Sequence, residues 1–377
     1  MEKYFLKNII KYLVISDIHL GHLQNKTSRI INNLIQYFKD NNKLFSKLDM
    51  IFIAGDVFER LLGSNSDDLN KSLEWLAILS NYCKKNNIKL RILEGTPSHD
   101  WKQVKLFKTT IEKMGIEIDF KYVETLHIER VEDLGLDILY VPDEWTNSPE
   151  KTFQEVEALL ALNNIEKVDI AIMHGMFKHQ LPFDLPGAHD EDSYLNIVRH
   201  FINIGHIHSS SVFGRILAQG SFDRLSHGEE EAKGGMVVTL TNASKPEFVF
   251  IENKNAAIFK TIKLTTKEIG KAVSEIKAIT KQYNAGEHIR IMFEEDNILR
   301  HSFKEIEKQF PMFVMKDDVK KNKDTKEIAK IDVDLNLECF SITPDNIIKL
   351  MDERMAKYSL RKPEREIYLE ELKSVLV

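Results

Sequence analysis

We predict an α/β protein whose main part is a two-layer β-sandwich flanked by helices, followed by a small βαβαβ domain. Short apolar runs such as Met50–Ala54 and Lys89–Leu93 alternate with longer stretches that carry apolar residues at helical spacing. The stretch 115–142 instead alternates with period two, which is typical of antiparallel strands. A second series of strand and helix signals, compressed into a short span, follows residue 257.

The predicted elements of the main part fall into two sets. The first is a βαβαβ unit with buried parallel strands at 12–16, Met50–Ala54 and Lys89–Leu93. The second set, after the alternating stretch, consists of strands at 168–173, 212–217 (pivoting on Gly214), 236–240 and 248–251. Two sets of strands with helices between them favour two packed sheets covered by helices.

Domain boundaries are predicted from changes in pattern. The main domain covers 1–257 and ends in the polar run ENKNAA. A small domain at 258–318 has strands at Phe259–Leu264, 288–293 and 313–316, with helices at 267–283 and 298–310. A charged linker is predicted at 319–342. Two amphipathic helices are predicted at 343–377, where Thr343 and Pro344 form a typical helix start.

Composition limits the class of protein. The chain has 377 residues, of which 43% are apolar and 29% charged, as in ordinary folded proteins. Its net charge of −6 argues against a general nucleic-acid coat, but allows an enzyme that holds DNA through a local patch. Cys83 and Cys339 lack zinc or redox spacing, so we expect buried free thiols in a reducing compartment.

The sequence shows no signal peptide and no apolar run long enough to cross a bilayer. We therefore expect a cytoplasmic protein without membrane contact. Abundant Lys, Asn and Ile suggest an AT-rich genome, and for a phage-encoded protein the compartment would be the host cytoplasm.

Histidines and aspartates gather at the predicted strand ends, where open α/β sheets place their functional sites. They are Asp17, His19, Asp56, His99, Asp100, His174, His206 and His208. Carboxylates mixed with imidazoles, without thiolates, suit Mn²⁺, Fe²⁺ or Zn²⁺. One such short motif alone is more often part of a turn, or contains a histidine that is buried and hydrogen-bonded in the core. Five such motifs in this order would be a rare coincidence, so we predict a site for divalent metal ions.

The order DxH, GD, a loop ending in HD, H and GHxH resembles that of calcineurin-like metallophosphoesterases. The segments SDIHLGH, AGDVFER and AQGSFDRLSHGEEEAKGGMVV are more specifically similar to the SbcD-type (Mre/SbcD) nucleases. These nucleases work in double-strand-break repair and phage recombination. The resemblance spans the chain, with its specific motifs at 14–238, and the small domain is similar to that family's DNA-binding capping domain.

The resemblance implies a site for two metal ions that share Asp56. The first ion would be held by Asp17, His19, Asp56 and His208, and the second by Asp56, His174 and His206. His99, with Asp100 after it, would be catalytic and would act on the leaving group.

One loop departs from the family pattern. The family usually places Asn before the catalytic His, where it binds the second metal. Here the loop GTPSHD is two residues longer and has Ser98 in the Asn position. We predict Ser98 as the ligand, with Thr96 or a water as alternatives. His22 and Arg60 are predicted to contact substrate, whereas His179 and His189 bracket a loop that could line the groove or simply connect elements.

By resemblance, the expected function is that of a metal-dependent DNA exonuclease or endonuclease, a hydrolase acting in recombination, repair and replication. The expected cofactors are two Mn²⁺ ions, with Mg²⁺ as the alternative. The expected partners are double- and single-stranded DNA, an SbcC-type coiled-coil ATPase that binds segment 343–377, and a second copy of the chain. The first alternative is a related phosphoesterase for small nucleotides or phosphoproteins. The second is a non-catalytic scaffold, which the intact His99 and metal-ligand set argue against.

Overall fold

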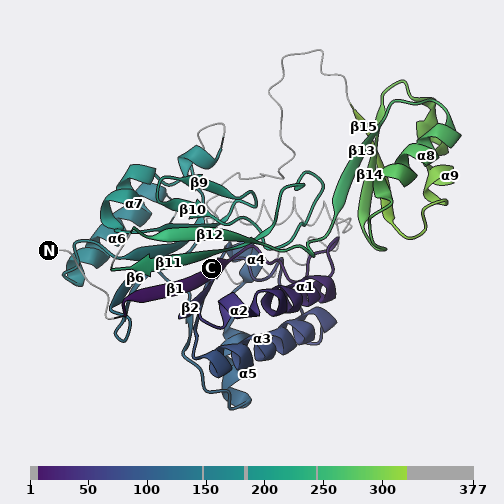
Figure 1. Cartoon of the computed structure of the whole chain (residues 1–377). Coiled ribbons are helices and arrows are strands. Elements are labelled where there is room, and N and C mark those ends of the chain that lie inside the picture. The colour runs from purple at the N-terminus through teal and green to yellow at the C-terminus, as the bar shows by residue number, and fades with distance from the viewer. Residues whose placement is uncertain (1–6, 147, 182–185, 243–244, 321–377) are drawn as a thin grey trace, which may run out of the picture. The chain divides into compact units, whose positions relative to one another are not determined.

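The fold is described from a computed structural model, which covers residues 7–146, 148–181, 186–242 and 245–320 (Figure 1). Cys339, the segment 343–377 and all of the predicted linker beyond residue 320 lie outside these described residues. The described part contains two six-stranded sheets and one three-stranded sheet.

The first sheet has the strand order β12-β11-β1-β2-β3-β4. Its strands are β1 (Ile9–Ile15), β2 (Met50–Ala54), β3 (Lys89–Leu93), β4 (Phe120–Val123), β11 (Gly234–Thr241) and β12 (Glu247–Glu252). Strands β1 to β4 run parallel, as predicted for the first three of them. The prediction of antiparallel strands from residue 115 onward is wrong for β4, which extends this parallel sheet instead. Short strands near a sheet edge are partly exposed on both faces, so their sequence does not show which partner they take.

The second sheet has the order β5-β6-β7-β8-β10-β9. Its strands are β5 (His127–Val131), β6 (Leu136–Val141), β7 (Ile170–Gly175), β8 (Ile202–His206), β9 (Ser211–Phe213) and β10 (Ile216–Ala218). β5 and β6 form the predicted antiparallel pair, but β6 then pairs parallel with β7. The strand predicted at 212–217 is a hairpin of β9 and β10, because Gly214 adopts a φ of +56° and reverses the chain.

Helices cover the outer face of each sheet. The first sheet carries α1 (Thr27–Asp40), α3 (Asp67–Asn86) and α5 (Lys105–Lys113), which lie side by side in Figure 1. The second carries α6 (Pro149–Leu162) and α7 (Glu191–Ile197). Shorter helical turns are α2 (Asn42–Phe45), α4 (Pro97–Asp100) and η1 (Lys178–Gln180).

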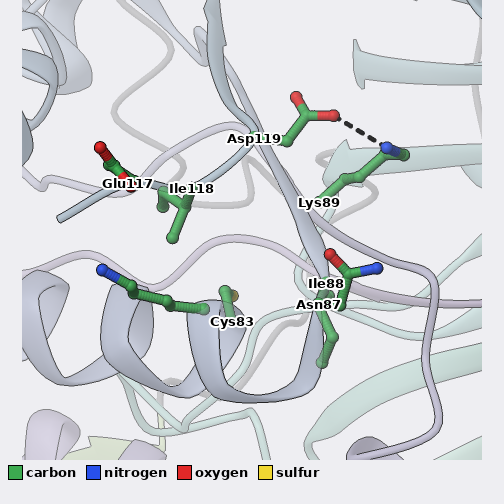
Figure 2. A pocket seen from close by; sticks show the side chains of 8 residues that line it. Cys83, Asn87, Ile88, Lys89, Glu117, Ile118 and Asp119 are labelled. Atoms are coloured by element: carbon green, nitrogen blue, oxygen red, sulfur yellow. Dashed lines mark hydrogen bonds and ion pairs between the residues drawn. The ribbon is translucent and has the colours of Figure 1, made fainter.

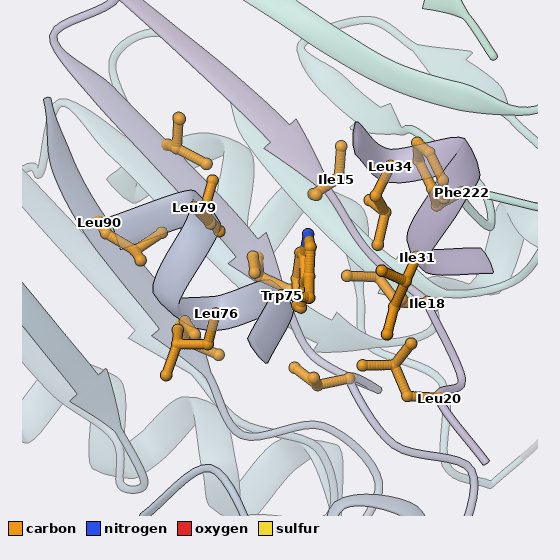
Figure 3. Packing of buried hydrophobic residues seen from close by; sticks show 14 of the residues in the cluster. Ile15, Ile18, Leu20, Ile31, Leu34, Trp75, Leu76, Leu79, Leu90 and Phe222 are labelled. Atoms are coloured by element: carbon orange, nitrogen blue, oxygen red, sulfur yellow. The ribbon is translucent and has the colours of Figure 1, made fainter. Parts of the chain in front are cut away.

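The alternation of side chains along β1 explains the layers. Tyr12 and Val14 belong to the core cluster between the two sheets, which also contains Phe52 and Tyr140. Leu13 and Ile15 point the other way and pack with the helices, where Trp75 of α3 lies at the centre of the cluster in Figure 3. A strand that is buried on both faces reads as a continuous apolar run, which is why these strands were predictable. The predicted two-layer α/β sandwich is confirmed.

The small domain forms the predicted βαβαβ unit. Its parallel sheet contains β13 (Phe259–Leu264), β14 (His288–Glu294) and β15 (Val314–Lys320), in that order. The connecting segments are α8 (Ile269–Thr280) and the pair η2 (Ile298–Ser302) and α9 (Phe303–Glu307), which share their own apolar core with the sheet. β15 reaches Lys320, so the predicted linker starts inside a strand.

A buried ion pair joins the two large sheets. Arg91 of β3 lies 2.9 Å from Glu129 of β5 between Nη2 and Oε1, and both residues are nearly inaccessible. Tyr140 of β6 also donates to Glu129. Burial works to raise the pKa of Glu129, but hydrogen bonding and charge from Arg91 outweigh it and the pKa is lowered.

We predict that Arg91→Ala destabilises the fold by about 3–5 kcal/mol, because the buried Glu129 carboxylate loses its buried partner and keeps only Tyr140 and the more exposed Lys121. Urea unfolding measures this, and Lys71→Ala, which removes an exposed helical pair with Asp67, is the control. The folded-state pKa of Glu129 lies below the unfolded value of about 4.3. The contribution of the pair is therefore present above that pH and is lost as the pH falls through the folded-state value. An equal loss of stability in both variants would contradict this prediction.

Candidate metal centre

The carboxyl ends of strands from both large sheets meet at one edge of the sandwich. From the first sheet, Asp17 and His19 follow β1, Asp56 follows β2, and the loop with His99 follows β3. From the second sheet come His174 in β7, His206 at the end of β8, and His208 just beyond it. Parallel strands bring their carboxyl ends to the same edge, which is why residues far apart in sequence converge here.

Three groups of these side chains have ligand atoms within 4.8 Å of one another and could hold a metal ion. They are Asp17 with His19 and His208, His19 with Asp56 and His99, and Asp56 with His174 and His206. Asp56 joins two of the groups, since its Oδ1 lies 3.2 Å from His174 Nε2 and its Oδ2 lies 3.7 Å from His19 Nε2. The structure thus brings together six of the seven predicted ligands, and only Ser98 is absent from these groups.

The backbone at these residues is in an unusual conformation. Asp17, His19 and Asp56 have φ near +50°, and His206 has φ of +97°. Non-glycine residues rarely adopt the left-handed region, and such strain concentrates at functional sites. Here it turns each side chain from the end of its strand toward the centre.

Three glycines let the two sheets approach closely around Asp56 and His174. A Cβ on Gly95 would collide with Asp56 Oδ1, and one on Gly55 would collide with His174 Nδ1. A Cβ on Gly205 would collide with the carbonyl oxygen of Ala54. The close approach gathers carboxylates and imidazoles at one place, and this set of donors fits a divalent cation.

Oxygen atoms close to Nδ1 orient the imidazoles. His174 Nδ1 lies 2.7 Å from the Ala54 carbonyl, His19 Nδ1 lies 2.7 Å from Glu59, and His208 Nδ1 lies 3.1 Å from Glu229. With Nδ1 engaged, Nε2 is left to face the centre, and the Nε2 atoms of His19 and His208 are 3.1 Å apart. Metal-binding histidines are usually oriented in this way.

The sequence reasoning missed Glu59 and Glu229. Both lie within the segments that carry the resemblance, AGDVFER and AQGSFDRLSHGEEEAKGG, so the signal for them was present.

The pKa values of the predicted ligands bear on cation binding. Burial works to raise the pKa of Asp56, but charge and hydrogen bonding from His174, with help from His99, hold that pKa well below its usual range. Burial lowers the pKa of His206, so this ring is a neutral ligand near pH 7. For His174 the effect of Asp56 outweighs burial and the pKa is raised. A metal ion must therefore displace a proton from His174, which weakens binding at low pH.

The loop after β3 corrects one prediction. Thr96, rather than Ser98, reaches the group of Asp56, His174 and His206: its Oγ1 lies 3.3 Å from His206 Nδ1 and 3.5 Å from His174 Nε2. Its backbone N–H also donates to Asp56 Oδ1. Ser98 is exposed at the surface of α4 and uses its carbonyl to accept from Trp101. The loop is two residues longer than in the family, and its residues 97–100 form α4. This helical turn places position 98 at the surface.

We predict that Thr96→Ala weakens binding at the group containing His174 and His206, whereas Ser98→Ala leaves metal affinity unchanged. Thr96 is the nearby neutral oxygen donor, and its loss removes a contact to both imidazoles. Mn²⁺ titration by calorimetry, expected to show about a tenfold or larger drop in affinity, measures the effect. The reverse ranking of the two variants would restore Ser98 as the ligand.

Asp143 is an acidic residue that the sequence reasoning missed. It follows β6, and its Oδ2 lies 3.0 Å from Thr96 Oγ1 and 3.6 Å from His206 Nδ1. The rule of strand carboxyl ends would have found it, but β6 was read as part of an antiparallel stretch. Its carboxylate adds negative charge beside His206.

Other predicted residues surround the centre. Asp100 is fully buried, and its two oxygens accept from the backbone N–H of Phe58 and Gly95, so in this structure it braces the loop. His22 caps a turn by accepting from the N–H of Asn25. The guanidinium of Arg60 is half exposed beside Gly21, whose carbonyl it contacts.

His179 and His189 flank residues outside the described part. His179 lies 2.7 Å from Glu191 and stacks on Phe213. His189 is buried, which lowers its pKa to about 4.

A cavity of about 440 Å³ lies elsewhere (Figure 2). It is found where α3 ends and β3 begins, at the opposite end of β3 from the loop with His99. Burial raises the pKa of Cys83 in its wall to about 12, so the predicted free thiol is buried and unreactive.

No family model matches the chain. Among solved structures, the chain is similar to GAP50, described as the anchor in the inner membrane complex of Plasmodium. That match has 16% identity and a TM-score of 0.40, and covers 66% of this chain and 86% of the other. It is also similar to TT1561 of Thermus thermophilus, with 11% identity, a TM-score of 0.38, and coverage of 65% and 100%. In the described residues no helix is both long and apolar enough to span a membrane.

Proposed function

We propose that the chain is a metal-dependent phosphodiesterase that cuts DNA, a nuclease of the SbcD type among the calcineurin-like metallophosphoesterases. The observation that carries the proposal is the position of Asp56. One carboxylate lies between two histidine groups, as a ligand shared by two neighbouring cations would. When bound, two such ions would supply Lewis-acid activation of a phosphate ester and of the water that attacks it.

In this proposal, six residues are metal ligands. Asp17, His19 and His208 would hold one ion, while His174 and His206 would hold the other, with Asp56 shared. We propose Mn²⁺ as the ion, because borderline ligands such as imidazole and carboxylate suit it, with Mg²⁺ as the alternative.

His99 has a different task. Its Nδ1 lies 2.9 Å from Asp56 Oδ2, and the side chain is about one-third exposed (34%), so the ring stands between the buried carboxylate and solvent. Hydrogen bonding and charge from Asp56 raise its pKa against the opposing effect of burial. A protonated imidazole at this place can donate a proton to the departing oxygen of a phosphodiester.

The choice of DNA and the partners belong to the proposal as well. The small βαβαβ domain supports it, because an enzyme for small nucleotides or phosphoproteins would not need one. We propose that an SbcC-type coiled-coil ATPase and a second copy of this chain complete the active complex, with 343–377 as the docking segment for the ATPase.

A nuclease assay tests the function. The purified full chain with Mn²⁺ is expected to cut single- or double-stranded DNA and to hydrolyse bis(p-nitrophenyl) phosphate, and EDTA is expected to stop both reactions. Phosphomonoesters, nucleotides and phosphopeptides are assayed in parallel. Activity on these substrates without any on DNA would favour the alternative phosphoesterase.

A further inference from the structure

We propose that Trp101 is a substrate-contacting residue that stacks on a nucleobase next to the phosphodiester at the metal centre. The inference rests on the proposed nuclease function and extends it. The metal centre would act on the phosphate, whereas Trp101 would contact the base beside it.

Trp101 is largely exposed although it lies in the turn that carries His99. It lies two residues after His99 and directly follows α4, and its side chain is 54% exposed. By contrast, Trp75 is 2% exposed in the core of the first sheet. Single exposed apolar residues are common on protein surfaces, so exposure alone says little. The position of this ring, in the turn that also carries His99, is what points to a ligand.

The backbone that presents this side chain is strained. Trp101 has φ of +49° and Lys102 has φ of +55°, so two consecutive non-glycine residues adopt the left-handed region. Such a pair persists only if its surroundings hold it. The N–H of Lys102 donates to the carboxylate of Glu94, a residue that is only 5% exposed and that also binds Tyr122. A buried acid thus maintains a turn that a glycine would form without strain.

A hydrogen bond fixes the orientation of the indole ring. Trp101 Nε1 donates to the carbonyl of Ser98 at 2.7 Å, and Ser98 is the residue before His99. This bond uses the edge of the ring, which leaves the faces available for stacking. Because His99 itself lies 2.9 Å from Asp56, the indole is anchored to the same short turn that faces the metal centre.

The chemistry around Trp101 suits a nucleic acid. The neighbouring Lys102 is exposed and supplies a cation beside the ring. An exposed aromatic ring next to a basic side chain is the usual platform of proteins that bind single strands, where bases stack without regard to sequence. A strand laid across α4 could place one base on Trp101 while the adjoining phosphate lies at the centre.

Binding without cleavage tests the inference. The full chain in EDTA is titrated with a short oligo(dT) probe and with an abasic oligonucleotide of the same length. Oligo(dT) is expected to quench tryptophan fluorescence in the parent, and W101F is expected to lose this quenching. W101A is expected to bind oligo(dT) about tenfold more weakly, with W101F in between, and to bind the abasic probe as the parent does.

Controls separate stacking from a structural effect. Met114→Ala removes a side chain of equal exposure (54%) at the end of α5 and is expected to change neither affinity. W101A is expected to melt close to the parent, because the indole packs little. Equal weakening on both probes, or loss of binding to a protein partner with oligo(dT) affinity unchanged, would overturn the inference.

Kinetics with Mn²⁺ distinguish this inference from the function on which it rests. W101A is expected to raise the KM for DNA with little change in kcat. If the parent cuts DNA and W101A matches it in KM, the stacking role fails and the nuclease stands. If the parent binds oligo(dT) with quenching but hydrolyses no phosphodiester, the nuclease function fails while the stacking site remains.

Discussion

Replacing Asp56 by alanine is expected to remove both metal ions and to reduce phosphodiester hydrolysis to the background rate. Asp56 belongs to the group with His19 and His99 and to the group with His174 and His206, and in the proposal it is the ligand that both ions share. The pKa of Asp56 lies well below the usual range, so its carboxylate is negatively charged. The alanine variant lacks this charge, which would attract the cations. Metal content by elemental analysis, measured beside the hydrolysis rate, tests this expectation.

Two further variants make the Asp56 experiment decisive. Asp56→Asn keeps the shape of the side chain and can still accept from the Thr96 N–H, so it checks that the loss comes from charge rather than from misfolding. Asp67→Ala removes an exposed carboxylate from the first turn of α3 and is expected to retain both ions. Retention of one tightly bound ion in Asp56→Ala would show that the ions do not share this ligand.

The sequence predicted the buried strands and the residues at their ends for a physical reason. Strands such as β2 and β3 are apolar on both faces, and their bounds at Met50–Ala54 and Lys89–Leu93 agree with the prediction. Convergence of Asp17, Asp56 and His174 then follows from the parallel arrangement, because all carboxyl ends lie at one edge. The βαβαβ unit at 259–320 was predictable on the same grounds.

The errors arose where local sequence does not determine the outcome. β4 is half exposed, so its period-two pattern fits an antiparallel hairpin as well as a parallel edge strand. Position 98 was assigned by counting back from His99, but α4 coils the loop and brings Thr96 to the centre instead. Asp143 was missed because its contacts with Thr96 and His206 depend on β6 pairing parallel with β7.

The positions of Glu59 and Glu229 behind the imidazoles also required the structure. Both residues lie in the segments that carry the resemblance. A carboxylate that orients a histidine can come from any segment that is near in space, so its distance along the chain does not show which histidine it contacts. Glu229 is 21 residues from His208, yet it accepts from that ring. The histidine charge helps to hold the pKa of Glu229 at about 2, against the opposing effect of burial.

Replacing His99 by alanine is expected to leave both ions bound and to slow DNA cleavage by about 10²–10⁴-fold, the usual contribution of a positioned general acid. The ring contacts Asp56 Oδ2 through Nδ1 and is partly exposed, so its proton can pass to a substrate oxygen. A substrate with a nitrophenolate leaving group needs no proton, and on bis(p-nitrophenyl) phosphate the variant is expected to lose much less activity. His301→Ala, at an exposed position of the small domain, is the control.

Because His99 also belongs to the group of His19 and Asp56, a lost ion in His99→Ala would show that His99 acts as a ligand. An equal loss on both substrates with full metal content would mean that His99 positions the phosphate rather than protonating the leaving group.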